Sequence, residues 1–213
     1  MRNRRLPSLV KNSLLLILLL GCAPVTKISS SKNPGYEGRV FHKIMVEARG
    51  PNPQQNIQLE WAFRAMFDQV RVPVTNATAL FPAVPPAQPV DRREVFQREG
   101  IDGILLVDLT NFRKDTIYHP PTSTQTEVRK RKDGSTYVVT SQSGDYTEHV
   151  MVQDHGLTLL SASELKPVWV GSASTSGDFK SHDEKSFYQS LAKQTVKDLA
   201  KAGLIQLGAP LPK

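Results

Sequence analysis

The sequence is poor in the residues from which compact chemical sites are most often built. Its 213 residues include one cysteine, five histidines and two tryptophans, and they contain neither an HExxH motif nor a cysteine–histidine cluster with zinc-site spacing. A P-loop, a GxGxxG fingerprint and a GxSxG nucleophile elbow are also missing. We therefore expect no metal, no cofactor and no catalytic activity. Four residues remain that only the tertiary fold could assemble into a hydrolytic site: Asp102, Asp108, Asp154 and His155.

A strong compositional bias is missing as well. With 39% hydrophobic and 22% charged residues, the chain falls outside the collagen, coiled-coil and disordered classes. The net charge of +7 includes four basic residues of a leader that we expect to be removed: Arg2, Arg4, Arg5 and Lys11. The 23 basic and 20 acidic residues that remain give a net charge of +3. We therefore expect no nucleic-acid partner.

The sequence also lacks an apolar run long enough to span a membrane. Leu14–Leu20 is an unbroken apolar run after a basic stretch. As a helix this run would rise about 10 Å, against about 30 Å for the hydrocarbon core of a bilayer. A basic segment followed by a short apolar run is typical of a secretory signal. We therefore expect residues 1–21 to be a signal peptide.

The apolar run ends in Leu19-Leu20-Gly21-Cys22, which resembles the lipobox of bacterial lipoproteins. The resemblance implies cleavage before Cys22, a diacylglyceryl group on its thiol and an acylated amino terminus, with palmitate as an expected chain. Ala23 stands where an aspartate commonly retains members of that family at the inner membrane, so an outer-membrane location facing the periplasm is implied. Lipidation would also block the single thiol, which has no disulfide partner. The alternative is a free cysteine at the end of a membrane segment.

The remaining chain divides into a tether, one domain and a tail. Residues 22–38 are rich in serine, proline and glycine without apolar periodicity, which predicts a flexible tether. Residues 39–205 are expected to form a single periplasmic α/β domain, and residues 206–213 a tail. The length of the domain is sufficient for a hydrophobic core that needs neither disulfides nor metal.

Hydrophobic periodicity gives the order of elements within that domain. We expect helices at residues 53–69, 91–99 and 181–203, the first with Ile57, Trp61 and Ala65 on its buried stripe. Asn52-Pro53, Asp91 with Glu94, and Ser181 with Glu184 are typical helix starts, and Gly203 with Leu204 predicts a Schellman end. Strands are expected at 39–48, 70–74, 101–109, 124–131, 135–142, 146–162 and 167–176, and a proline-rich loop at 75–89.

This order predicts an α/β (α+β) fold, in which a mixed sheet with an antiparallel meander carries helices packed on it. Trp61 and Trp169 lie in amphipathic elements with apolar neighbours, so both are expected in the core. Asp102 and Asp108 flank a very apolar strand. They are interpreted as turn and strand-exit residues, with a perturbed catalytic carboxylate as the alternative.

The layout resembles the lipoprotein domains of the curli-secretion and penicillin-binding-protein-activator type. The matching segments are Gly100–Leu105, Leu159–Ala162, Pro167–Trp169 and the helix end Asp198–Ile205. The resemblance implies a non-catalytic scaffold, a secretion-pore subunit or an activator of synthases. On this basis we expect an accessory or scaffold subunit for envelope assembly or secretion, whose partner is another envelope protein or a second copy of itself.

One charge cluster stands out. Arg129, Lys130, Arg131 and Lys132 precede Asp133-Gly134, a strong hairpin signal, and residues 113–132 carry a net charge of +4. A basic hairpin tip in the periplasm could bind peptidoglycan or anionic lipid. The alternative is a solvated tip whose charges keep a sheet edge from pairing with other chains.

Overall fold

The structure, a computed structural model, describes residues 23–81, 91–120, 124–131, 135–142, 144, 146–178 and 183–211. Six strands form one sheet in the order β1-β8-β7-β4-β2-β3, and two further strands form the separate pair β5-β6. The strands are β1 (Val25–Lys32), β2 (Ile44–Arg49), β3 (Val74–Asn76), β4 (Gly103–His119), β5 (Thr124–Lys130), β6 (Thr136–Gln142), β7 (Tyr146–Ser161) and β8 (Pro167–Asp178). Strand β2 is parallel to β3 and β4, and the other neighbours are antiparallel. This confirms the predicted mixed sheet with an antiparallel meander.

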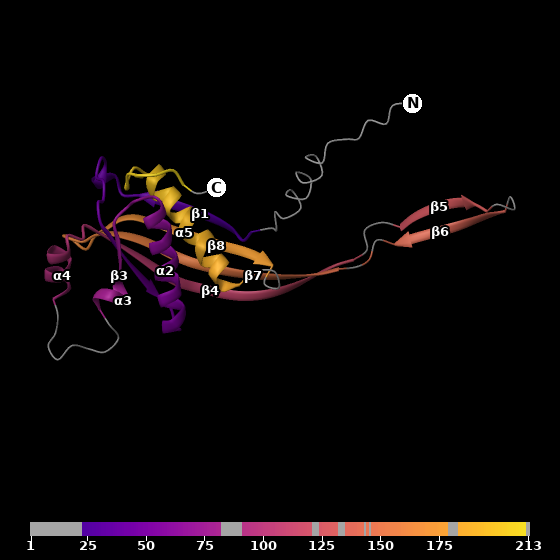
Figure 1. Ribbon diagram of the computed structural model, residues 1–213, viewed down its shortest axis with the longest axis horizontal. Helices are drawn as coiled ribbons and strands as arrows, with labels where there is room; N and C mark the ends of the chain where they lie inside the picture. The colour runs from indigo at the N-terminus through magenta and orange to yellow at the C-terminus, as the bar shows by residue number, and fades with distance from the viewer. Residues whose placement is uncertain are drawn as a thin grey trace, which may run out of the picture.

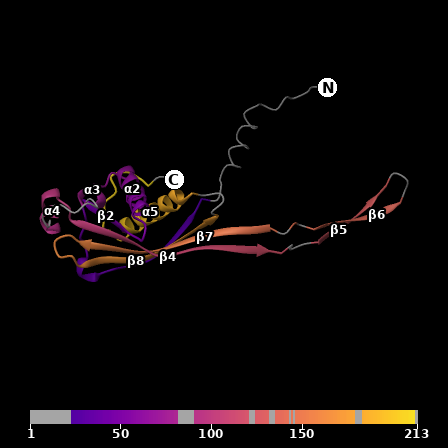
Figure 2. The same cartoon turned by 90° about the horizontal axis from the view of Figure 1, so that it is seen from below.

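Helices lie on both faces of this sheet. The two long helices, α2 (Pro53–Gln69) and α5 (Glu184–Lys201), cover one face (Figures 1 and 2). Leu105 and Val107 of β4 belong to the large core beneath them. Ile104 and Leu106 alternate with these residues and therefore face the opposite side, where they join a smaller core with α3 (Ala77–Leu80) and α4 (Arg92–Glu99). Burial on both sides explains the unbroken apolar run of this strand.

Local capping chemistry sets the helix ends as predicted in most cases. The Asn52 side chain accepts a hydrogen bond from the Gln54 amide (3.0 Å) at the start of α2. The Asp91 side chain accepts one from the Arg93 amide (2.8 Å) at the start of α4. At the end of α5, Gly203 has a φ of 69° and the Leu204 amide donates to the Leu199 carbonyl (3.0 Å). That bond closes the predicted Schellman motif.

The predicted tether is wrong, because Val25–Lys32 within it forms a strand of the sheet. Strand β1 pairs antiparallel with β8 over its whole length, and η1 (Pro34–Tyr36) follows it. The apolar periodicity is missing because hydroxyl groups replace it on the covered face: Thr26 Oγ1 lies 2.9 Å from Thr175 Oγ1 and 2.8 Å from Ser190 Oγ. The folded domain therefore includes Val25 and does not begin at Arg39.

Further boundaries differ from the predictions, and the strand expected at 39–48 is β2, which begins only at Ile44. The residues 70–74, expected as a strand, mostly form the turn after α2, in which Arg71 has a φ of 59°, and β3 begins at Val74. The expected loop 75–89 contains the last residues of β3 and the whole of α3. Its residues 82–89 lie outside the described chain. Helix α5 is capped by Asp183, whose side chain accepts from the Ser186 amide (3.0 Å), and not by Ser181, which is also outside the described residues.

Candidate interaction surfaces

A two-stranded arm leaves the body of the molecule where β8 ends. The outermost pair between β7 and β8 joins Val150 to Asp178, and the pairing of β2 with β4 ends at Asp108. Farther out, β4 and β7 pair with each other up to His119 and Tyr146, and β5 and β6 continue in the same direction (Figures 1 and 2). We call residues 115–150 the arm. The sequence analysis ended this strand at Leu109, because no long apolar run follows it. The strand continues to His119 as part of an exposed ribbon.

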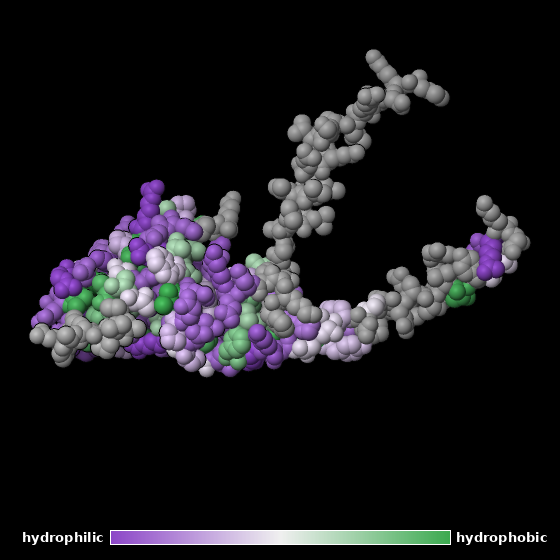
Figure 3. Space-filling view, turned by 60° about the horizontal axis from the view of Figure 1, so that its bottom comes forward, coloured by the Kyte–Doolittle hydropathy of each residue, from purple (hydrophilic) through white to green (hydrophobic). Residues whose placement is uncertain are grey.

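Apolar side chains gather on the arm, and none of those whose exposure the structure describes is buried. Ten large hydrophobic side chains are exposed among the described residues, and half of them belong to the arm: Ile117, Tyr118, Val128, Val138 and Tyr146. Val128 and Val138 lie directly opposite each other in the β5–β6 register and are 66% and 60% exposed. Figure 3 shows a hydrophobic patch near the far end of the arm. Large exposed apolar patches mark interaction sites, and the paired valines are therefore a candidate contact point.

Side-chain contacts hold the outer end of the β4–β7 ribbon together. The rings of His119 and Tyr146, which are paired across the two strands, stack with centroids 4.4 Å apart and planes 10° apart. His119 Nε2 also lies 3.0 Å from Glu148 Oε2. Cross-strand pairs of this type contribute roughly 0.2–1 kcal/mol each, so they give the ribbon local stabilisation.

The predicted hairpin is present, and part of its basic tip is described. Lys130, the last residue of β5, is exposed, and so is Arg131. The Arg131 amide donates to the Ser135 carbonyl (2.8 Å), which narrows the hairpin toward its turn. The side chain of Arg129 and the whole of residues 132–134, including Lys132, lie outside the described residues. Binding of an anionic partner by the four basic residues stays a prediction.

Residues next to Cys22 are bound directly to the body. Cys22 itself lies outside the described residues, but Pro24 accepts a hydrogen bond at its carbonyl from Ser190 Oγ of α5 (2.8 Å). Val25 is paired with Ser176 of β8. Consecutive Cα atoms are about 3.8 Å apart, so a group attached at position 22 would begin within about 12 Å of the sheet. Among the described residues, no helix is long and apolar enough to cross a membrane.

The residues considered as a hydrolytic set do not form one site, and Asp108 lies within β4, opposite Gly156, and not at a strand exit as interpreted. Both carboxylate oxygens of Asp102 accept backbone hydrogen bonds, from the amides of His42 (2.8 Å) and Lys43 (3.0 Å). This agrees with the turn interpretation of Asp102. Asp154 and His155 are neighbours on β7 and therefore point to opposite faces of the sheet. The described residues hold no group of three His, Cys, Asp or Glu side chains that could bind a metal ion.

His155 is a buried residue under the long helices. It is 1% exposed and lies opposite Ala173 of β8. Burial lowers the pKa of His155 to about 4, although the neighbouring Asp154 carboxylate opposes the shift. The hydrogen bond from Ser174 to Asp154, supported by Asn111, in turn lowers the pKa of Asp154 against the effect of desolvation. His155 is therefore neutral at neutral pH and is shielded from any substrate in solution.

Glu60 is a buried residue whose role the sequence analysis missed. Its carboxylate is 1% exposed and accepts hydrogen bonds from the Ala48 amide (3.3 Å), the Thr78 amide (3.1 Å) and the Thr78 hydroxyl (2.6 Å). Burial raises the pKa of Glu60, while the Thr78 bonds oppose that rise. These bonds tie α2 to β2 and α3. The sequence could have indicated this burial, because Glu60 shares one face of the helix with Phe63 and Phe67.

Trp61 is not in the core, contrary to the prediction, whereas Trp169 is. Trp61 is 55% exposed and Trp169 is 1% exposed. The buried face of α2 carries Leu59, Glu60, Phe63, Met66 and Phe67. Leu59, Phe63 and Phe67 recur at intervals of four residues and form a larger apolar stripe than Ile57, Trp61 and Ala65, which explains the different orientation of the helix.

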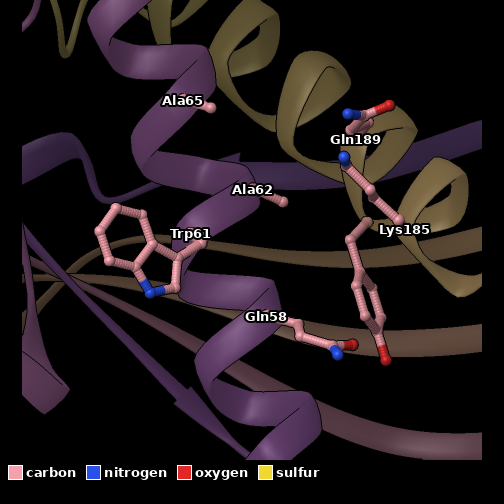
Figure 4. Close-up of a pocket in the computed structure, with 7 residues that line it drawn as sticks. Gln58, Trp61, Ala62, Ala65, Lys185 and Gln189 are labelled. Carbon is pink, nitrogen blue, oxygen red and sulfur yellow. The ribbon is translucent and has the colours of Figure 1, made fainter.

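The exposed tryptophan borders a hollow between the two long helices. The hollow has a volume of about 350 Å³ and is lined by Gln58, Trp61, Ala62, Ala65, Lys185, Tyr188 and Gln189. Figure 4 shows Ala62 and Ala65 pointing from α2 toward α5, where Lys185 and Gln189 lie. Two alanines leave room there that larger side chains would fill. The Arg64 guanidinium lies 5.2 Å from the centroid of the Trp61 ring.

A second hollow continues the first one. Its volume is about 470 Å³, and Ala62, Ala65 and Gln189 line both hollows. Its other walls are Ala23 and Pro24 at the beginning of the described chain, Met66 and Gln69 of α2, and Ser186, Ser190 and Lys193 of α5. We call the two hollows together the α2–α5 groove. It extends from the Trp61 side chain to the residues that follow Cys22.

Comparison with known proteins gives remote structural likenesses only. No protein-family model matches this chain, and no curated protein matches it. A PelC dodecamer from Paraburkholderia phytofirmans is 14% identical, with a TM-score of 0.48, and the match covers 85% of this chain and 100% of that one. The lipoprotein GNA1162 from Neisseria meningitidis is also 14% identical, with a TM-score of 0.40 and coverages of 75% and 98%. Likenesses at this level do not assign the chain to a family.

Proposed function

We propose that the chain is a non-catalytic lipoprotein of the cell envelope that serves as an accessory or scaffold subunit for envelope assembly or secretion. In this proposal Cys22 carries the lipid, and the domain faces the periplasm from the outer membrane. The arm is the observation that carries the proposal. A ribbon that projects from the body with exposed apolar side chains is suited to contact another macromolecule and contributes nothing to a catalytic pocket.

The physical reason lies in what stabilises such a ribbon. A two-stranded hairpin alone is marginally stable in water, and a long strand edge readily pairs with another chain. The arm leaves large side chains such as Tyr118, Val128 and Tyr146 in contact with water. Contact with an envelope protein or with a second copy of the chain would bury these side chains. We expect the arm to be the element through which this protein assembles.

The close attachment of residues 23–25 to the body also fits an anchored subunit. A lipid on Cys22 would hold the sheet near the membrane surface, because no flexible tether separates the two. The free end of the arm could then reach partners away from the anchor. This arrangement supports an envelope scaffold better than a freely moving binding module.

The anchor is tested by Cys22→Ser in the full chain, with metabolic labelling by a fatty-acid analogue. We expect label on the wild type, no label on the variant, and release of the variant from the membrane fraction. Label that persists on Cys22→Ser would contradict the proposal. Ser13→Ala, a change within the expected leader, is the matched control and should keep the label.

The role of the arm is tested by removing its outer part. Because His119 and Tyr146 are paired across the ribbon, residues 120–145 can be replaced by Asn-Gly, which closes a tight hairpin. We expect thermal unfolding of the body to be preserved and complexes of the detergent-solubilised protein to become smaller in sedimentation. Unchanged complexes from the shortened chain would show that the arm is not the assembly element.

A second candidate function is binding of peptidoglycan or anionic lipid by the basic tip, which the exposed positions of Lys130 and Arg131 favour. Electrostatic binding of this kind weakens as salt rises. The assay is pull-down of residues 23–213 with isolated peptidoglycan and with anionic vesicles at two salt concentrations. If Arg129, Lys130, Arg131 and Lys132 are all changed to Gln and binding does not fall, the tip is only a solvated turn.

A further inference from the structure

We propose that the α2–α5 groove holds one acyl chain of the lipid on Cys22 while the protein is outside a bilayer. The inference rests on the proposed lipidation of Cys22 and goes beyond it, because it assigns a binding site for the lipid on the protein itself. The groove lies on described residues only, and its occupant is covalently part of the mature chain. Three observations lead to this assignment.

The first observation is where the chain enters the groove. Ala23 and Pro24 line its second hollow, and Cys22 is bonded to Ala23. Ser190 Oγ donates to the Pro24 carbonyl (2.8 Å) and lies 2.8 Å from Thr26 Oγ1. These contacts fix the direction of the chain at the mouth of the groove. The acyl chains would therefore start beside the groove, and a short covalent link gives them a high effective concentration there.

The second observation is the chemistry of the walls. The methyl groups of Ala62 and Ala65 and the ring of Tyr188 supply apolar surface in the first hollow, and Trp61 borders it. Lys185 and Lys193 contribute aliphatic stems and can keep their ammonium groups in water at the rim. A flexible hydrocarbon chain makes no hydrogen bonds and can follow such a shallow, mostly apolar channel. A polar ligand would find few partners in the first hollow.

The third observation is length. The residues of α2 that line the groove run from Gln58 to Gln69, which is about 16 Å at a rise of about 1.5 Å per residue. The hydrocarbon core of a bilayer is about 30 Å thick and contains two opposed acyl chains, so one chain spans about 15 Å. The groove can therefore accept most of one chain. A bilayer buries a chain more completely than a groove does, so the site would be occupied only outside the membrane.

The test uses the lipidated full chain, labelled in cells with a fatty acid that carries an alkyne and a photoreactive diazirine. The purified protein is diluted below the critical micelle concentration of its detergent, irradiated at once and digested for mass spectrometry. We expect adducts in the monomer band that join the lipid to peptides from Pro53–Gln69 and Glu184–Lys201. Adducts only in a band of dimer size, or only elsewhere on the chain, would overturn the proposal while leaving lipidation intact.

Two variants of α2 sharpen the test. Ala65→Lys places a long charged side chain at a residue that lines both hollows and should remove most of the adduct. Gln54→Lys adds the same charge to the same helix outside the groove and should leave the adduct unchanged. Trp61→Ala, which removes an exposed side chain, is a second groove variant should Ala65→Lys fail to fold, and it should also reduce the adduct.

The outcomes separate the two proposals. If the wild type takes up no label, the lipidation of Cys22 is wrong and the groove proposal falls with it. If the label is present but the groove variants give the same adducts as Gln54→Lys, only the groove proposal is overturned. A dimer-size adduct would instead place the acyl chain, or the groove, in an interface between two copies.

Discussion

The body and the arm of this protein are built from the same strands under opposite conditions. Leu105 of β4 and Leu157 of β7 are buried in the body, where α2 and α5 cover them. Farther along the same two strands, Tyr118 and Tyr146 are 59% and 61% exposed. The body is stabilised by burial, whereas the described part of the arm shows backbone pairing and cross-strand side-chain pairs and no buried side chain. The comparison teaches that the exposed side chains of the arm do not contribute to the core. They are therefore the first place to seek a partner.

The largest expected contrast is between core and arm truncations. Leu191 of α5 is fully buried against the sheet, so Leu191→Ala should destabilise the protein by about 2–5 kcal/mol. Val128→Ala in the arm should change the free energy of unfolding by less than about 0.5 kcal/mol. Thermal or denaturant unfolding measures both. Equal losses would mean that the arm is part of the cooperative core.

A pH-dependent contrast comes next. The pKa of His155 is lowered to about 4 from 6.5, so the unfolded chain binds its proton at higher pH than the folded chain. Stability should therefore fall as the pH drops from about 6.5 to about 4, by roughly 3 kcal/mol from this residue. His155→Gln should lose that part of the dependence in denaturant titrations at pH 7 and pH 4. Identical profiles for the wild type and His155→Gln would show that His155 is not desolvated.

Two glycines allow a comparison of backbone requirements. Gly203 has a φ of 69° at the end of α5, and a Cβ there would meet nothing within 4 Å. Gly203→Ala should therefore cost about 1–2 kcal/mol through the left-handed backbone alone. Gly144 in the arm also has open space around it, without a positive φ, so Gly144→Ala should be close to neutral. Unfolding free energies of the two variants decide the matter, and a neutral Gly203→Ala would argue against the Schellman end.

The smallest contrast concerns surface charges. Arg92 Nη2 lies 2.6 Å from Glu47 Oε2 in the body. Burial acts to raise the pKa of Glu47, but the contacts with Arg92 and Arg49 lower it overall. Arg92→Gln should cost up to about 1 kcal/mol, as for partly exposed pairs. Replacing Lys130 and Arg131 in the arm by Gln should change stability by less than about 0.5 kcal/mol. Calorimetry can rank the two variants, and a larger loss from the arm variant would show that the charges of the tip contribute to folding.

The parts of the fold that could be predicted are those fixed by local chemistry. Asn52, Asp91 and Gly203 bind or shape the backbone within a few residues of themselves, so their sequence context was sufficient. The apolar strand at 101–109 was recognised because both of its faces are buried. The fold class followed from the order of these elements. Lipidation of Cys22 and anionic binding by residues 129–132 remain predictions, since Cys22, Lys132 and the Arg129 side chain lie outside the described residues.

The parts that were missed depend on partners far away in the sequence. Strand β1 looks like a linker because its covered face uses Thr26 to contact Thr175 and Ser190 in place of an apolar stripe. Trp61 was placed in the core because periodicity gives the spacing of a stripe but does not choose between two competing faces of one helix. The groove could not be foreseen either, since it requires α2, α5 and the residues after Cys22 to meet.

The most direct test of the account places a photoreactive amino acid at Val128 of the arm, or at Lys197 on the exposed side of α5, in the full chain in intact cells. Irradiation followed by electrophoresis and mass spectrometry identifies what each position touches. The account predicts discrete adducts with an envelope protein or a second copy from position 128, and few from position 197. Adducts that are no stronger from position 128 than from position 197 would contradict the claim that the arm is the contact element of a membrane-anchored scaffold.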